Sequence, residues 1–270
     1  MKPLLQPTHQ ESHQTDPKVS GIWLLVTCYL AAAILMWMLK RHYSSAGADQ
    51  IRWMLQPVSG LVAWLSGSDY VWESGIGYVR ADRQFTIAPA CAGINFMIMT
   101  FGLTVAAFLH RCRHNAGRII GLAGALSGAY LLTLAVNAAR IVLAIALYEH
   151  EAAWGWLTPE RLHRLAGVVV YFGALGLYYA LLKRIMARKS TLFQMHPRVS
   201  ALLPWAWYVL GAVAVPAVNR IYHGQRLPAS EHALTVIGAS ALLWGLGFAA
   251  VSLLKASRTD SHFNRCHRNN

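Results

Sequence analysis

A run of 30 residues, Ile119 to Tyr148, constrains the fold of this chain more than any other feature, because it is apolar almost throughout. About 20 apolar residues are enough for a helix to cross a hydrocarbon core about 30 Å thick, so this run is longer than one crossing needs. The composition agrees with a membrane protein. Of the 270 residues, 56% are apolar and 13% are charged, whereas soluble proteins average about 25% charged residues.

Further apolar runs divide the chain into a polar tail (1–19), an integral membrane domain (20–254) and a basic tail (255–270). The predicted fold class is therefore all-α, a polytopic transmembrane helix bundle of about six spans. The spans are expected near residues 20–39, 87–109, 119–140, 163–182, 201–218 and 233–254. The first run ends in Met-Leu-Lys-Arg instead of a small-residue cleavage site, which predicts a retained span and not a signal peptide.

The segment between the first two spans has a mixed pattern. Its apolar patch, residues 51–65, is short and interrupted by Gln56, Pro57 and Gly60, so an interfacial or re-entrant segment is expected there. Closer to the second span, Tyr78–Arg80 and residues 84–87 flank a polar turn. This alternation predicts a small hairpin.

The formal charge of +13 has two interpretations. In a soluble protein it would suggest nucleic acid, but basic residues beside apolar runs also set membrane topology and contact anionic lipid. We therefore expect membrane lipid and no nucleic acid as a partner. Lys and Arg gather in the loops 110–118 and 183–198 and in the C-terminal tail, which predicts that these face the cytoplasm. Lys40, Arg41 and Arg52 fall on the opposite side and count against this orientation.

With this topology, Cys91, Arg140 and His163 reach the same depth from three different helices. At 1.5 Å per residue, each lies about 27–33 Å from the basic end of its helix. All three are then expected near the outer interface. A thiol, a guanidinium and an imidazole at one level are the groups that a thiol-dependent acyl transfer needs.

Two helix starts are predicted beside this level. Pro89 suits the first turn of a helix, which would put Cys91 among free backbone N–H groups that favour a thiolate and receive an oxyanion. Thr158 and Pro159 predict a capped start for the helix of His163, which could act as acid and base. Glu160 precedes His163 by three residues on the same face, where it either orients His163 or simply suits a first helical turn.

Arg140 follows Asn137 by three residues, so the two polar groups share one face of an apolar helix. Burial of these groups without a purpose would be costly. An intramembrane arginine predicts a functional site, in which it clamps a substrate carbonyl or carboxylate or stabilises an oxyanion.

At these residues the sequence resembles the exosortase/archaeosortase family of polytopic membrane cysteine transpeptidases, over roughly residues 60–185. The resemblance is carried by Pro89-Ala90-Cys91-Ala92-Gly93-Ile94, by Asn137-Ala138-Ala139-Arg140-Ile141, and by His163 followed by Gly167. It implies that Cys91 is the nucleophile, His163 the acid and base, and Arg140 the cation that stabilises the transition state or positions the substrate. Asn137, Glu160 and Gly93 would support them.

The resemblance also implies a substrate and a place. Members of this family are thought to cleave exported proteins at a C-terminal tripartite signal: a short motif such as Pro-Glu-Pro, a hydrophobic helix and a basic cluster. A thioester at Cys91 would then be resolved by water or by an unknown acceptor. The expected location is the cytoplasmic (inner) membrane, with the active site on the extracytoplasmic face.

Two alternatives stay open at this point. A small transporter or channel would also place Arg140 in a polar cavity, but would not need Cys91. In a non-catalytic membrane assembly factor, Cys91 would be dispensable. No organic cofactor or metal is expected, because the four cysteines, Cys28, Cys91, Cys112 and Cys266, form no C-x-x-C pair and the chemistry requires no such group.

Overall fold

The computed structural model describes residues 17–112, 114–149, 158–187, 197–217 and 233–249. Within these residues, five helical segments are long and apolar enough to cross a membrane, and a shorter apolar helix, Ala233–Ala249, follows them. The five are Ile22–Ser45, Pro89–Arg111, Asn115–Glu149, Arg161–Met186 and Ser200–Ala217. The predicted all-α, polytopic membrane bundle is confirmed. The tails 1–16 and 250–270 lie outside the described residues.

The labelled helices are α1 (Pro17–Ser45), α2 (Arg52–Ser66), α3 (Ile94–Phe108), α4 (Asn115–Glu149), α5 (Pro159–Ala187) and α6 (Pro197–Val209). Tighter 3₁₀ turns occur at Asp49–Ile51, Pro89–Cys91 and Leu109–Arg111, and a π-helical turn, Leu210–Ala214, continues α6. Pro204 lies inside α6, so this proline is accommodated within the helix.

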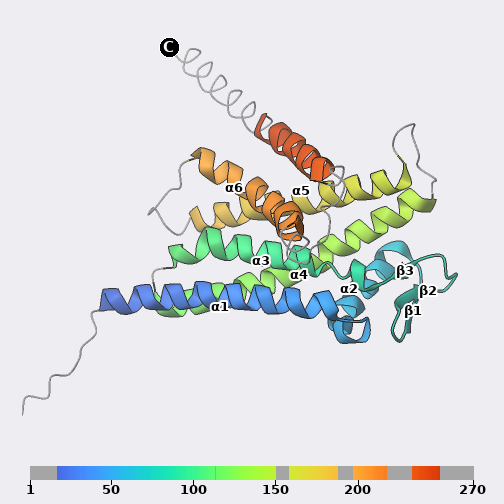
Figure 1. Ribbon diagram of the computed structural model, residues 1–270, viewed down its shortest axis with the longest axis horizontal. Helices are drawn as coiled ribbons and strands as arrows, with labels where there is room; N and C mark the ends of the chain where they lie inside the picture. Colours follow the sequence, from blue (N-terminus) through green and yellow to red (C-terminus); the bar gives the residue numbers. More distant parts are fainter. Residues whose placement is uncertain (1–16, 113, 150–157, 188–196, 218–232, 250–270) are drawn as a thin grey trace, which may run out of the picture.

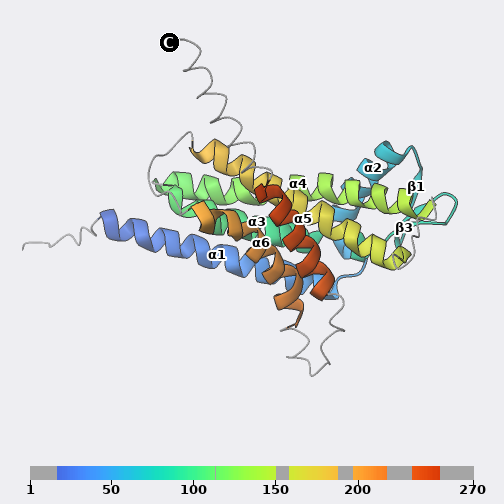
Figure 2. The same ribbon diagram turned by 90° about the horizontal axis from the view of Figure 1, so that it is seen from above.

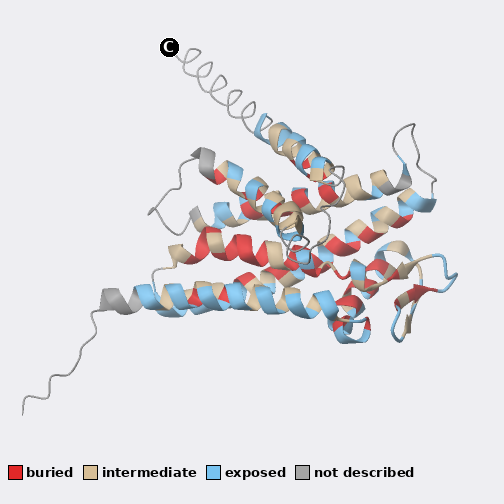
Figure 3. Ribbon diagram, in the orientation of Figure 1, coloured by how far each residue is buried: buried red, intermediate tan, exposed pale blue. Residues whose placement is uncertain are grey.

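Helix α3 is the centre of the bundle. In the most apolar 18 residues of Pro89–Arg111, the segment that contains α3, 72% of the residues are buried. The corresponding stretches of α4 and α5 are 22% buried, and that of α1 is 11% buried. Figure 3 shows the same contrast, with α3 largely buried and α1 largely exposed. Because α1 carries large exposed apolar side chains such as Trp23, Leu30 and Trp37, its outer face suits contact with lipid.

Successive spans run in opposite directions, so residues distant in sequence meet at one end of the bundle. Figure 1 places α2, the strands, the start of α3, the end of α4 and the start of α5 at this end. Figure 2 shows, from above, helix 233–249 lying across α5 and α6. Helix α4 has 35 residues, or about 53 Å. It continues beyond the predicted limit at residue 140 because Arg140 and Asn137 find polar partners inside the bundle and do not interrupt it.

The strand-bearing segment makes a three-stranded antiparallel sheet in the order β1 (Tyr70–Glu73), β2 (Gly77–Arg80), β3 (Thr86–Ile87). Tyr78 pairs with Ile87, which confirms the predicted hairpin. Strand β1 was not expected. It is held by its pairing with β2 and by the edge-on contact of Trp72 with Tyr78, at 5.0 Å between ring centroids. At Gly77 (φ +130°) a side chain would collide with the carbonyl oxygen of Ile87.

Helix α2 occupies the segment for which an interfacial or re-entrant position was expected. With 15 residues it spans about 22 Å, which is too short for a crossing. One face, including Met54, Leu55 and Val58, is fully buried, whereas Trp53 and Trp64 on the other are exposed. Amphipathicity of this kind suits a helix at the membrane interface.

Arg80 fastens the sheet to the end of α4. Its Nη1 lies 2.6 Å from Oε1 of Glu149, and its Nη2 lies 2.8 Å from Oδ2 of Asp82. The side chain of Arg80 is only 10% exposed, while both carboxylates are nearly half exposed. The hydrogen bonds to Asp82 and Glu149 raise the pKa of Arg80, and the bond from Arg80 lowers the pKa of Asp82. Because β3 leads directly into Pro89–Cys91, this ion-pair network also fixes the base of that turn.

We predict that Arg80→Gln loosens the sheet, because two carboxylates lose their shared partner. The midpoint of thermal unfolding in detergent should fall by a few degrees. Arg83→Gln, which removes the more exposed ion pair of Arg83 with Glu73, is the control and should change the midpoint little. The folded pKa of Asp82 is depressed, so its contribution is present above the unfolded pKa of about 3.9 and is lost as the pH falls through the folded value. A midpoint unchanged in Arg80→Gln at neutral pH would contradict this account.

Candidate active site

The sequence predicted that Cys91 lies in the first turn of a long helix. In the structure it lies instead in a separate turn that precedes the helix. Pro89 opens the 3₁₀ turn Pro89–Cys91, Ala88 before it is extended, and α3 begins only at Ile94, after Gly93. We call residues 88–93 the cysteine turn. Gly93 is left-handed (φ +75°), and this conformation breaks the helix between Cys91 and α3.

The amide groups of the cysteine turn are divided between two uses. The amides of Cys91 and Ala92 donate to the carbonyl groups of Ala88 and Pro89, at 2.8 and 3.0 Å. Both are therefore occupied within the turn and are not free to bind another group. In the described part of the chain, the first amides of α3, at Ile94 and Asn95, have no recorded acceptor, as is usual at a helix start. The amides beside Cys91, which the sequence predicted to be free, are therefore occupied, and the amides without an acceptor lie at the start of α3.

Asn137 connects the cysteine turn to the rest of the site. It is fully buried on α4. Its Nδ2 donates to the backbone carbonyl of Cys91 at 2.5 Å, and its Oδ1 accepts from the Tyr171 hydroxyl at 2.8 Å and from Arg140 Nε at 3.3 Å. A buried amide with each end satisfied is orientationally fixed, because an alternative orientation would leave donors or acceptors unpaired.

Gly93 makes the approach of Asn137 feasible. A Cβ at this position would lie 2.9 Å from Cγ and 3.1 Å from Nδ2 of Asn137. The position therefore requires glycine for two independent reasons, its left-handed backbone and its contact with α4. This gives a physical basis to the glycine in the Pro-Ala-Cys-Ala-Gly motif.

Arg140 is held from two sides. Its Nε bonds to Asn137, and its guanidinium lies over the ring of Tyr171, 5.3 Å from the centroid. Tyr171 in turn stacks on Phe96 of α3 at 4.7 Å. A guanidinium stacked on an aromatic face and bonded through Nε has its position fixed.

His163 reaches the site through a cavity of about 230 Å³. Arg140 and His163 both line it, and the two are within electrostatic range of one another. The predicted cap of α5 is confirmed, because Thr158 Oγ1 accepts from the Arg161 amide at 3.4 Å. The side chain of Glu160 lies outside the described residues. Among those described, no hydrogen bond joins the Cys91 thiol to the His163 imidazole.

Asn137 thus contacts the backbone of Cys91, the position of Gly93 and the side chain of Arg140, and Arg140 shares a cavity with His163. Sequence reasoning missed Tyr171 and Tyr43. The hydroxyl of Tyr43, on α1, donates to the carbonyl of Pro89 at 3.4 Å, and both tyrosines are within electrostatic range of Cys91 and Arg140. Tyr171 lies eight residues after His163, two helical turns along α5, which is the one sequence signal that could have suggested it.

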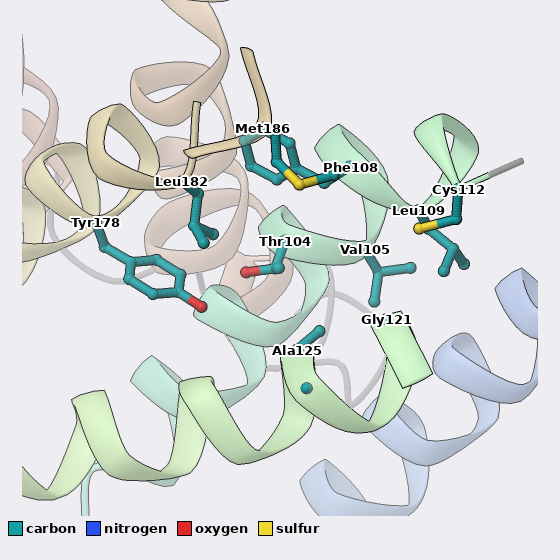
Figure 4. Close-up of a pocket in the computed structure, with 11 residues that line it drawn as sticks. Thr104, Val105, Phe108, Leu109, Cys112, Gly121, Ala125, Tyr178, Leu182 and Met186 are labelled. Carbon is teal, nitrogen blue, oxygen red and sulfur yellow. The ribbon is translucent and has the colours of Figure 1, made fainter. Parts of the chain in front are cut away.

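The other described cysteines have different surroundings. Cys28 is buried on α1. Cys112 lines a mostly apolar cavity of about 170 Å³ at the far end of the bundle, where it lies close to Leu109 (Figure 4). Burial raises the pKa of the Cys112 thiol, more than the nearby Arg118 lowers it, so this thiol is a poor nucleophile. Cys266 lies outside the described residues. Within the described ranges, His, Cys, Asp and Glu side chains form no group that could hold a metal ion.

Comparison with known proteins gives one match. The family model described as transmembrane exosortase matches residues 58–180, which include the cysteine turn, Asn137, Arg140, His163 and Tyr171. No curated protein and no solved structure matches the chain. The matched range begins in α2 and ends in α5, close to the limits of 60–185 expected from the three motifs.

We predict that Gly93→Ala disrupts the cysteine turn. The left-handed backbone alone costs a non-glycine residue about 1–2 kcal/mol, and the contact with Asn137 adds to this. In a variant that keeps only Cys91, the rate of its reaction with a maleimide should change and the unfolding midpoint should fall. Gly176→Ala, on α5 with open space around the added carbon, is the matched control; it should leave the maleimide rate unchanged and should not lower the midpoint, because alanine suits a helix interior better than glycine. Equal behaviour of the two variants would refute a special role for Gly93.

Proposed function

We propose that this chain, whose residues 58–180 match the transmembrane exosortase family model, is a membrane cysteine peptidase or transpeptidase that removes C-terminal sorting signals from exported proteins. The family match and the apolar helices support a multi-pass membrane protein of the protein-sorting class. The observation that carries the enzymatic proposal is the bond network of Asn137, which ties the backbone of Cys91 to Arg140 inside the bundle.

In the proposed first step, the Cys91 thiolate attacks the carbonyl carbon of the scissile peptide bond. The carbon–sulfur bond forms and the carbonyl electrons move to oxygen. Arg140 supplies the positive charge that balances the thiolate and the resulting oxyanion, since it lines this cavity and is held in place through its Nε by Asn137. The amides of Ile94 and Asn95 at the start of α3 are suited to share that oxyanion.

The tetrahedral intermediate then collapses. The carbon–nitrogen bond breaks, the amine of the cleaved tail accepts a proton, and a thioester remains on Cys91. We assign the delivery of this proton to His163, which takes it from the Cys91 thiol before the attack and lines the same cavity as Arg140. Attack of water or of an acceptor amine on the thioester breaks the carbon–sulfur bond. His163 takes the proton from the attacking group and passes it to the leaving sulfur, which regenerates the thiol.

The proposed substrate and location follow from the family and from the distribution of charge. The substrate is an exported protein with a C-terminal motif, a hydrophobic helix and a basic cluster. The cysteine turn lies at the end of the bundle opposite Arg111, Arg118 and Lys183. Since basic residues favour the cytoplasm, this arrangement supports an active site on the extracytoplasmic face of the inner membrane.

The deciding experiment compares the C-termini of membrane and secreted proteins in the native host by mass spectrometry. With Cys91→Ala, proteins that keep a hydrophobic, basic-ended tail should accumulate, and the cleavage motif can be derived from the wild-type termini. Cys112→Ala is the matched control and should resemble wild type, because Cys112 lies at the far end of the bundle. Identical termini with and without Cys91, at equal expression, would end the peptidase proposal.

Arg140→Lys should lose most of the processing, by about a hundredfold, which is typical for removal of one preorganised partner of an oxyanion. A lysine cannot stack on Tyr171, bond to Asn137 and direct a second nitrogen into the cavity at once. Arg41→Lys serves as control, since Arg41 is an exposed arginine over the ring of Trp37, where a point charge suffices. Full processing by Arg140→Lys would remove the guanidinium from the mechanism.

A further inference from the structure

A second cavity adjoins the one that holds Arg140 and His163. The first, of about 230 Å³, and the second, of about 430 Å³, share Arg164 and Thr235 in their linings. Together they form a groove between α5 and helix 233–249, which we call the α5 groove. It extends from the catalytic end over six further lining residues: Arg161, Leu165, Leu234, Gly238, Ala239 and Leu242.

The α5 groove has a cationic end and an apolar remainder. The cationic end is lined by Arg140, His163, Arg161 and Arg164. Among the described residues, no Asp or Glu lines either cavity. Leu234 and Leu242 line the remainder and are 66% and 70% exposed, so their side chains face the surroundings of the bundle. A groove of this composition complements an apolar segment that carries a negative charge at one end.

Its shape favours a helical occupant. Leu234, Gly238 and Leu242 recur every four residues and lie on one face of helix 233–249. Nothing lies within 4 Å of a Cβ built at Gly238, and Ala239 beside it is also small. Small residues on an exposed face within a membrane let a second helix approach closely.

We propose that the α5 groove binds the apolar transmembrane segment of the substrate, with Arg161 and Arg164 holding a carboxylate at that segment's outer end. The inference rests on the proposed function and assigns its recognition site. A lipid headgroup could offer the same negative charge, but continuity with the cavity of Arg140 and His163 favours the substrate. Helix 233–249 lies outside residues 58–180, the range that the family model matches.

The first test uses variants that fill the α5 groove with a larger side chain or remove its positive charges. It measures retained C-terminal tails by the mass spectrometry described above. Gly238→Leu should block the occupant, and the double variant Arg161→Gln/Arg164→Gln should weaken capture of its charged end. Each is expected to reduce processing by about tenfold or more, with the chain still present in the membrane. Gly247→Leu, an exposed position with open space that does not line the groove, is the control and should process as wild type.

A second test locates the occupant directly. A benzophenone amino acid at Leu242, in the Cys91→Ala background, should crosslink to the proteins that retain tails, whereas the same probe at Leu246, 68% exposed but outside the groove lining, should not. Crosslinks to lipid alone, or equal crosslinks at both positions, would overturn the inference.

The two proposals fail in different ways. Retained tails in Cys91→Ala together with normal processing in the groove variants would discard the groove and leave the peptidase. Absence of retained tails in Cys91→Ala would discard both.

Discussion

The fixed orientation of one buried amide, that of Asn137, underlies the whole site. Its Nδ2 holds the carbonyl of Cys91 and its Oδ1 receives Tyr171 and Arg140, so three elements, the cysteine turn, α4 and α5, meet at a single side chain. In a bilayer, water does not readily replace a lost partner, and each of these bonds resists exchange. The position of Arg140 is thus determined by the same side chain that holds the backbone of Cys91.

The sheet and the ion pairs act on the cysteine turn from the other side. Strand β3 precedes the turn immediately, and Arg80 links the neighbouring strand to Glu149 at the end of α4. Asn137 and Glu149 lie on the same helix, three turns apart. Helix α4 therefore contacts the cysteine turn through Asn137, and it contacts the sheet that precedes this turn through the ion pair of Glu149 with Arg80. These two contacts leave the segment from Arg80 to Gly93 little freedom to shift along the helix.

Much of this could be predicted from the sequence, since apolar runs of sufficient length allow few structures other than membrane helices. The motif spacings likewise indicated that Cys91, Asn137 and Arg140 share a site. The separate turn around Cys91 was not predicted, because Pro89 signals a helix start without indicating where the helix next breaks, and only the approach of Asn137 shows why Gly93 is left-handed. Tyr43 and Tyr171 were missed because aromatic residues in apolar helices resemble ordinary packing residues until their hydroxyl partners are known.

The hydroxyl of Tyr43 gives α1 a part in the site, although α1 precedes the range that the family model matches. Lys40 adds to this contact, with Nζ at 3.0 Å from Oδ1 of Asn95 in the first turn of α3. The matched segment from α2 to α5 consequently depends on α1 for two contacts at the site. A minimal version of the protein for reconstitution or engineering has to begin at α1, and grafting the cysteine turn onto another bundle would require a helix that supplies a hydroxyl and an ammonium group at the same height.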